Sequence, residues 1–196
     1  MNNSLINNYN IDILRDLTGT IVFAAEKHKH QKRKGAAGIP YINHPLEVMH
    51  LILNTLEEPS VELLEASILH DTLEDTDATE AELKERFGSL VCELVTEVSD
   101  DMSLSSVTRK QRQIDNAQDL SGSACCIRIA DKTCNIRDIL YTRIKWPRQR
   151  KIAYIQWAID VIDRIRGRFP ELEAQFGSAV KEAEEILKYN FKMQEK

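Results

Sequence analysis

The stretch ASILHDTLEDTD occupies residues 66–77 and joins an apolar run to a row of acidic and potentially metal-binding side chains. Apolar residues between Val61 and Leu69 recur at helical spacing, which predicts the buried side of a helix. His70 and Asp71 follow at its end, where neighbouring side chains can reach one cavity from a single point. This stretch therefore predicts a buried helix that ends at a candidate site.

Helical periodicity extends outward from this stretch over almost the whole chain. Pro45 lies where the first turn of a helix tolerates proline, and Gly88 closes a short helix that begins at Thr79 with a capping-box pattern. Residues 100–108 are polar and serine-rich, which predicts a flexible loop, and we see no strand pattern or repeat. The fold class expected is an all-α bundle. Helices are predicted over about 12–31, 45–54, 61–72, 79–87, 91–98, 124–141, 151–166 and 171–187.

The length and charge of the chain limit its organisation and its partners. A chain of 196 residues fits a single domain, 1–196, and we expect residues 1–10 and about 188–196 to be flexible. The net charge of -5 argues against a general nucleic-acid binder. No run of about 18 apolar residues is present, so we expect no membrane span. Nothing in the sequence sets an oligomeric state.

The cysteines indicate a reducing compartment. Cys92, Cys125, Cys126 and Cys134 show no C-x-x-C spacing, and we predict that all four are reduced thiols packed on helices. The N-terminus has neither the charged start nor the apolar run of a signal peptide. These features predict a cytoplasmic protein.

Two further side chains of metal-ligand type lie at helix positions that could aim them into a cavity. Asp131 lies inside an apolar helix, where an unpaired carboxylate would be costly to bury. His44 lies between a loop rich in glycine and proline and the start of a helix. Together with His70 and Asp71 they would form a mixed nitrogen and oxygen site, which suits Mn²⁺ or Fe²⁺. The alternatives are that Asp131 forms a salt bridge with Lys132 and that His44 only caps its helix.

Three motifs occur in order along the chain: Y-I-N-H-P at residues 41–45, H-D-T-L-E-D-T at 70–76 and D-K-T-C-N at 131–135. They resemble the motifs of the hydrolase domain of RelA/SpoT-type alarmone enzymes, within the HD superfamily. The resemblance is closest to the stand-alone small alarmone hydrolases and covers about residues 10–185. It implies an HD-domain helical bundle in which His44, His70, Asp71 and Asp131 hold one metal ion, usually Mn²⁺. The implied reaction removes the 3′-pyrophosphate of (p)ppGpp, the nucleotide of the stringent response, and yields GDP or GTP.

The resemblance also implies roles for other residues. It assigns Glu74 and Asp75 to positioning or deprotonating the attacking water, and their place three and four residues after Asp71 agrees with this. The alternative is that residues 74–77 form a solvated acidic turn. The nucleotide substrate would be bound by residues that match the family's basic pair, its motif asparagine and its late helix: Arg33, Lys34, Asn135, Arg150 and Tyr154.

Three hypotheses on function follow. The first is an enzyme that hydrolyses a guanosine alarmone. The second is an HD phosphohydrolase that acts on another nucleotide, such as (p)ppApp or NADPH. The third is an inactive HD module that senses nucleotides, and the intact ligand set together with Glu74 and Asp75 argues against it.

Overall fold

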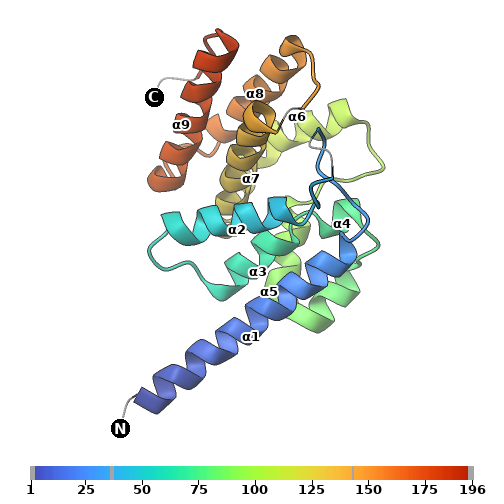
Figure 1. Cartoon of the computed structure of the whole chain (residues 1–196), viewed down its shortest axis with the longest axis vertical. Helices are drawn as coiled ribbons and strands as arrows, with labels where there is room; N and C mark the ends of the chain where they lie inside the picture. The colour runs from blue at the N-terminus through green and yellow to red at the C-terminus, as the bar shows by residue number, and fades with distance from the viewer. Residues whose placement is uncertain (1–2, 36–37, 143, 194–196) are drawn as a thin grey trace.

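The computed structural model describes residues 3–35, 38–142 and 144–193, and these form a helical bundle (Figure 1). Within these ranges the extended pairing is limited to one isolated antiparallel bridge between Lys32 and Pro40. The predicted all-α fold class is confirmed. The helices are α1 (Asn3–Lys27), α2 (Asn43–Thr55), α3 (Val61–Leu69), α4 (Thr72–Asp75), α5 (Glu80–Val98), α6 (Ser106–Asn116), η1 (Ala117–Asp119), α7 (Gly122–Tyr141), α8 (Arg148–Asp163) and α9 (Pro170–Leu187).

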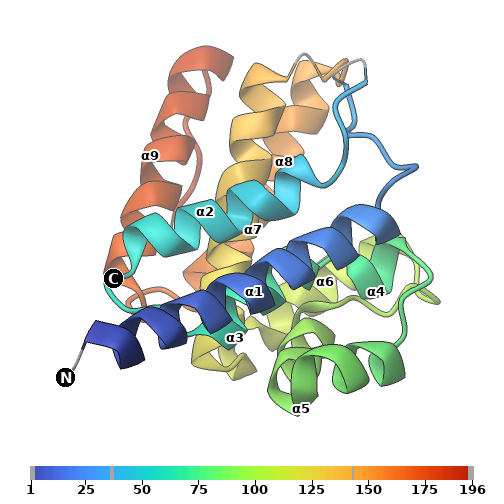
Figure 2. The same cartoon turned by 60° about the horizontal axis from the view of Figure 1, so that its bottom comes forward.

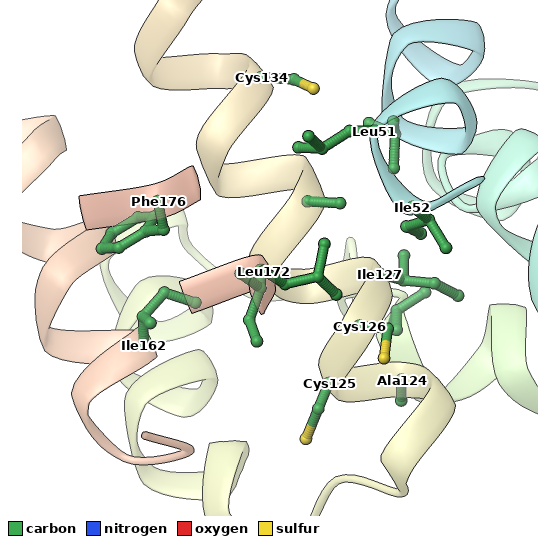
Figure 3. Close-up of a cluster of buried hydrophobic side chains, with 14 of the residues drawn as sticks. Leu51, Ile52, Ala124, Cys125, Cys126, Ile127, Cys134, Ile162, Leu172 and Phe176 are labelled. Atoms are coloured by element: carbon green, nitrogen blue, oxygen red, sulfur yellow. The ribbon is translucent and has the colours of Figure 1, made fainter. Parts of the chain in front are cut away.

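Helix α7 forms the centre of the bundle. It packs against α2, α5, α8 and α9, and most of its side chains from Ala124 to Ile139 are buried. Figure 2 shows α9 and α8 flanking α7 on its left and right, while α1, α3 and α5 lie below. Each fully buried aliphatic or phenyl side chain contributes about 1.5–3 kcal/mol. The close-up in Figure 3 shows the core between α2, α7, α8 and α9, with Leu51, Ile52, Ala124, Cys125, Cys126, Ile127, Cys134, Ile162, Leu172 and Phe176.

All four cysteines are unpaired and buried, as predicted. Cys92 lies on α5 and the other three lie on α7. Burial raises the pKa of Cys126 and of Cys134 to about 12, so both remain protonated thiols at neutral pH. These side chains act as small apolar core residues.

The first helix differs from the predicted range of 12–31. Helix α1 starts at Asn3, so residues 3–10, which we expected to be flexible, are helical, and it ends at Lys27. After Lys27 the chain turns into a loop, in which the backbone N–H of Arg33 donates a hydrogen bond to Ile39 O at 3.0 Å. Residues 1–2 and 194–196 of the two termini that we expected to be flexible lie outside the described residues.

The segment from Lys188 to Met193 packs back onto the bundle. Lys188 adopts a left-handed conformation, with φ of 48°, and ends α9. Phe191 is buried, and the backbone of Lys192 exchanges two hydrogen bonds of 2.9 and 3.1 Å with the side chain of Gln156 on α8. Arg148 at the start of α8 donates to Leu187 O at 2.6 and 2.9 Å and so satisfies a carbonyl at the end of α9.

Helices α4 and α6 are absent from the sequence prediction. Helix α4 is a single turn that continues directly from the His70–Asp71 corner. Helix α6 starts at Ser106, inside the predicted flexible loop of 100–108, and the Ser105 hydroxyl accepts the N–H of Thr108 at 3.2 Å. None of its residues is buried, so it lacks the apolar periodicity from which the other helices were predicted.

Gly88 separates the two helices that were predicted over 79–87 and 91–98. Its φ of 85° and ψ of 170° are not helical, so α5 consists of two helical segments joined at a kink. Only glycine adopts this conformation readily. In the described part of the chain, no helix is long and apolar enough to cross a bilayer.

Candidate functional site

The packing of α2 against α7 brings His44 to Asp131. His44 is the second residue of α2 and is 1% exposed, and its Nε2 lies 3.1 Å from Asp131 Oδ1. The N-cap of α2 is Ile42, and no side chain caps the helix. The alternative that His44 only caps its helix is therefore wrong.

The end of α3 brings His70 and Asp71 to the same point. His70 Nδ1 lies 2.8 Å from Ser67 O, so Nδ1 carries the proton and donates it to the carbonyl. Nε2 therefore faces the two carboxylates, 3.1 Å from Asp71 Oδ2 and 3.8 Å from Asp131 Oδ1, and becomes a metal ligand once it has lost its own proton. Such a hydrogen bond fixes the tautomer and ring orientation that a metal-binding histidine needs.

The donor set fits a divalent cation. Ligand atoms of His44, His70 and Asp131 all lie within 4.8 Å of one another, and all three residues are buried. Asp71 Oδ2 adds a further oxygen 3.7 Å from His44 Nε2. His70 Nε2 is buried and makes no hydrogen bond to the described residues, which is costly unless the atom binds a ligand. Two imidazoles and two carboxylates suit a metal with open coordination positions better than a closed structural zinc site.

The two histidines differ in their electrostatic environment. Burial lowers the pKa of His44, which keeps its imidazole neutral. Burial also disfavours the charged form of His70, but the carboxylates of Asp71 and Asp131 outweigh it and raise the pKa of His70 to about 10. A cation bound among these groups would compete with that proton, because a histidine ligand must be deprotonated.

Three neighbouring side chains orient the two carboxylates. The Tyr41 hydroxyl donates to Asp71 Oδ2 at 2.6 Å, and burial and Asp71 raise the pKa of Tyr41, so it stays a donor. Lys132 Nζ lies 2.9 Å from Asp131 Oδ2, and Asn135 Nδ2 donates to Asp131 Oδ1 at 2.5 Å. The predicted Asp131–Lys132 pair therefore exists, and it exists within the candidate metal site.

Two adjoining cavities make up the site. The metal cavity has a volume of about 150 Å³, and the larger one, called the nucleotide cavity because the family resemblance implies a nucleotide there, has about 380 Å³. Tyr41 and Asn135 line both and form the partition between them. The metal cavity is lined by Tyr41, His44, His70, Asp71, Glu74, Val98, Gln113, Ile127, Arg128, Asp131, Lys132 and Asn135.

The nucleotide cavity brings together four of the five predicted substrate-binding residues. Arg33, Lys34, Asn135 and Tyr154 line it, although they come from distant parts of the chain. Arg150 is not part of this lining, and its guanidinium packs 4.2 Å over the ring of Trp146, which does line it.

Arg33 is held in place before any substrate binds. Its guanidinium forms an ion pair with Asp138 and lies 3.3 Å from Asn135 Oδ1. Both partners of the ion pair are largely buried, so the charge of Arg33 is largely balanced locally. Lys34 is exposed, and its ammonium forms no ion pair within the described residues.

An aromatic wall closes one side of the nucleotide cavity. Trp146 and Tyr154 line the cavity, with ring centroids 5.8 Å apart, and Trp157 packs behind Tyr154 at 5.2 Å without lining the cavity itself. The ammonium of Lys132 lies 4.5 Å over the Trp157 ring, so the wall also supports the lysine that pairs with Asp131.

The predicted catalytic pair is divided between the two cavities. Glu74 lines the metal cavity, and burial together with the charge of Asp71 raises its pKa to about 7. Asp75 lines the nucleotide cavity, and burial and Asp71 raise its pKa as well. Glu74 is half-buried, so a solvated acidic turn does not describe it, whereas Asp75 and Asp77 are exposed and that alternative stays open for them.

Several lining residues were missed from the sequence. Asp138 could have been found, because it follows Asn135 by three residues and so shares a helix face with Asp131 and Asn135. Trp146 and Gln113 gave no signal, because the first lies in a loop and the second lies on the unpredicted α6.

A family model, several relatives and a solved structure match most of this chain. The family model described as "HD domain" matches residues 20–159. The guanosine-3′,5′-bis(diphosphate) 3′-pyrophosphohydrolase MESH1 of Danio rerio is 40% identical over 158 residues, which cover 80% of this chain and 88% of that protein. MESH1 of Homo sapiens is 40% identical over 152 residues, with coverage of 77% and 85%. A solved structure, described as a metazoan orthologue of SpoT that hydrolyses ppGpp, superposes with a TM-score of 0.81 at 36% identity and covers 85% of this chain and 94% of its own.

Proposed function

The chain belongs to the HD-domain family, and from this premise we propose that it is a metal-dependent hydrolase of guanosine alarmones. It removes the 3′-pyrophosphate of (p)ppGpp and gives GDP or GTP plus pyrophosphate. The observation that carries the proposal is the junction of the two cavities at Tyr41 and Asn135, because a donor set for one cation adjoins a basic and aromatic cavity. The names of relatives that match most of this chain agree with that substrate.

Membership of the family implies a divalent metal, and we propose Mn²⁺ as the ion. His44, His70, Asp71 and Asp131 would hold it, and their mixture of imidazole and carboxylate supports Mn²⁺ over softer metals. When bound, the ion lowers the pKa of water and polarises a phosphoryl oxygen.

Glu74 supplies the general base in this proposal. It lines the metal cavity but does not belong to the ligand set, and its pKa of about 7 matches a group that accepts a proton near neutral pH. The water oxygen attacks the phosphorus next to the ribose O3′, the bond from phosphorus to O3′ breaks, and O3′ leaves with the proton that Glu74 accepted from the water. Asp75 faces the nucleotide cavity and contributes by orienting the substrate.

The nucleotide cavity provides the binding energy. Arg33 and Lys34 bind phosphate oxygens, Asn135 and Tyr154 contact the nucleoside, and Arg150 approaches from the rim above Trp146. Arginine suits this task because its planar guanidinium binds phosphate through paired hydrogen bonds. A small-molecule nucleotide is thus the partner that we propose, and the buried unpaired cysteines support a cytoplasmic location.

Product analysis by anion-exchange chromatography tests the function. The Mn²⁺-loaded protein is incubated with ppGpp, with its adenosine counterpart and with NADPH in parallel, and Asp131→Asn serves as the control that lacks a ligand. We expect GDP and intact pyrophosphate from ppGpp with the unaltered chain alone. Release of single phosphates, or activity confined to NADPH or to the adenosine nucleotide, would reject the proposed substrate and leave a hydrolase of another nucleotide. Binding without turnover of any of the three would indicate a sensing module.

A further inference from the structure

Gln113 reaches the metal cavity from a helix that carries none of the predicted site residues. It lies on α6, is half-buried, and lines the metal cavity together with Glu74 and the candidate ligands. It lies outside the three motifs at residues 41–45, 70–76 and 131–135.

Its amide is anchored in one orientation. Gln113 Nε2 donates to both carboxylate oxygens of Asp100, at 2.9 and 3.0 Å. The backbone N–H of Asp100 in turn donates to Glu74 Oε1 at 2.8 Å. Because an ionised carboxylate only accepts hydrogen bonds, the nitrogen of the amide must face Asp100 and the oxygen must face away from it.

The amide oxygen is left without a donor. Gln113 Oε1 is buried and has no hydrogen-bond partner among the described residues. A buried acceptor without a donor is costly, so such an atom is normally matched by a ligand or by water.

The chemistry of the cavity selects the missing donor. Phosphate oxygens are acceptors, as is the Gln113 oxygen, so the two cannot bond each other. A nucleobase or ribose is too large for a cavity of about 150 Å³ that also holds a phosphoryl group, whereas a water, with a share of liquid volume of about 30 Å³, fits. A water molecule is therefore the donor that fits both the chemistry and the volume of this cavity.

We propose that Gln113 is a further catalytic residue, which accepts a hydrogen bond from the attacking water and aims it at the phosphorus. This inference rests on the proposed function. The water has two protons: Glu74 accepts one as the oxygen attacks, and Gln113 holds the other, which stays on the pyrophosphate that is formed. Asp100 is a positioning residue, since it fixes Gln113 through its carboxylate and Glu74 through its backbone.

The first test separates catalysis from binding. Gln113→Met keeps the length of the side chain and removes the acceptor, and Gln111→Met makes the same change at an exposed position of α6. We expect Gln113→Met to lower kcat on ppGpp about tenfold to a hundredfold with KM and Mn²⁺ affinity unchanged, because misplacing a reacting group costs up to about 10²-fold. Gln111→Met should match the unaltered chain. Unchanged kcat in Gln113→Met, or a rise in KM alone, would overturn the proposal.

The second test does not depend on turnover. Relaxation of water protons by the Mn²⁺-loaded protein reports how fast water exchanges at the ion. We expect faster exchange in Gln113→Met than in Gln111→Met, because a hydrogen-bond acceptor beside the ion is lost. If the chain does not hydrolyse ppGpp but exchange still differs, the proposed substrate fails while the role of Gln113 stands. If ppGpp is hydrolysed and neither kcat nor exchange differs, the role of Gln113 fails while the proposed function stands.

Discussion

The two carboxylates of the candidate metal centre differ in the number of hydrogen bonds that they accept. Asp131 accepts hydrogen bonds from Lys132 and Asn135, while Asp71 accepts one from Tyr41. Asp131 is therefore the carboxylate with more partners, and Lys132 beside it is 3% exposed. Removing that carboxylate leaves a buried ammonium without its partner, which costs about 3–5 kcal/mol. The less disruptive change to asparagine is thus the better test of metal binding.

We expect Asp131→Asn to lower metal affinity strongly while the fold is kept. The substitution removes the anionic oxygen that faces His44 but leaves an oxygen that can still accept from Lys132. Elemental analysis after gentle purification should find about one metal ion per unaltered chain and much less in the variant. Asp160→Asn changes the same residue type on the exposed side of α8 and should not alter the metal content. A full metal complement in Asp131→Asn would show that the ion binds elsewhere.

Substitutions of Glu74 and Asp75 should change different kinetic constants. We expect Glu74→Gln to lower kcat about 10²-fold or more, a typical contribution of a general base, with KM nearly unchanged. Asp75→Asn should mainly raise KM, because Asp75 lines the nucleotide cavity. Steady-state rates on ppGpp measure both. Equal losses of kcat in both variants would show that the pair acts on the water together.

The pH profile tests the same assignment of Glu74. Its pKa is raised to about 7, so the carboxyl is increasingly protonated below that pH and can no longer accept a proton. The kcat of the unaltered chain should therefore fall as the pH drops. The midpoint of this fall should lie at or below pH 7, since a cation bound nearby would lower the raised pKa of Glu74. This fall should be missing in Glu74→Gln.

At the level of residues, the sequence predicted the ligand-type side chains from their helix contexts: Asp131 inside an apolar helix, His70 at the end of one and His44 before the start of one. His44, His70 and Asp131 converge as expected. The contacts that tie them to their neighbours could not be predicted, since Tyr41 and Gln113 reach the site through tertiary packing and not through local pattern.

Among the elements, the two-part helix α5 shows how one residue sets a helix boundary. Gly88 has φ of 85°, and a Cβ built there meets no atom within 4 Å, so a substitution is disfavoured by backbone strain and not by crowding. Gly177 also has open space around its position, but it lies within helix α9. The two glycines form a matched pair.

We expect Gly88→Ala to lower the free energy of unfolding by about 1–3 kcal/mol, the cost of holding a residue with a side chain in that conformation. Gly177→Ala should instead raise it by about 0.4–1 kcal/mol, because alanine favours the helix. Denaturant unfolding measures both, and neither change should alter kcat. Equal effects of the two substitutions would contradict the strain assigned to Gly88.

Helices that bury an apolar face were predicted from the sequence, and the helix that buries none was not. Helices α2, α3, α7, α8 and α9 each bury an apolar face, and their predicted ranges lie close to the observed ones. Helix α6 buries none of its residues, so periodicity could not reveal it, although it carries Gln113.

Over the whole molecule, the candidate centre joins parts of the bundle that are distant in sequence. His44 belongs to α2, His70 and Asp71 lie between α3 and α4, and Asp131 belongs to α7. An ion bound to all of them is bound by the folded chain and not by the unfolded one, so it adds to stability.

We expect Mn²⁺ to raise Tm and chelation to lower it. At a free ion concentration of about 100 times Kd the gain is about 2.7 kcal/mol, which corresponds to a shift of about 5–10 °C for a chain of this length. Calorimetry of the chelated and the Mn²⁺-loaded protein gives the shift. Asp131→Asn should show little of it, and an equal rise in both proteins would mean that the ion acts outside this centre.

The aromatic wall has a practical consequence for optical work on this protein. Trp146 and Trp157 are the two tryptophans of the chain, and both belong to that wall. Trp146 therefore emits from the proposed nucleotide cavity itself, while Trp157 lies behind Tyr154 and outside its lining. A nucleotide that enters the cavity would change the emission directly, so occupancy could be titrated with the unlabelled protein and without turnover.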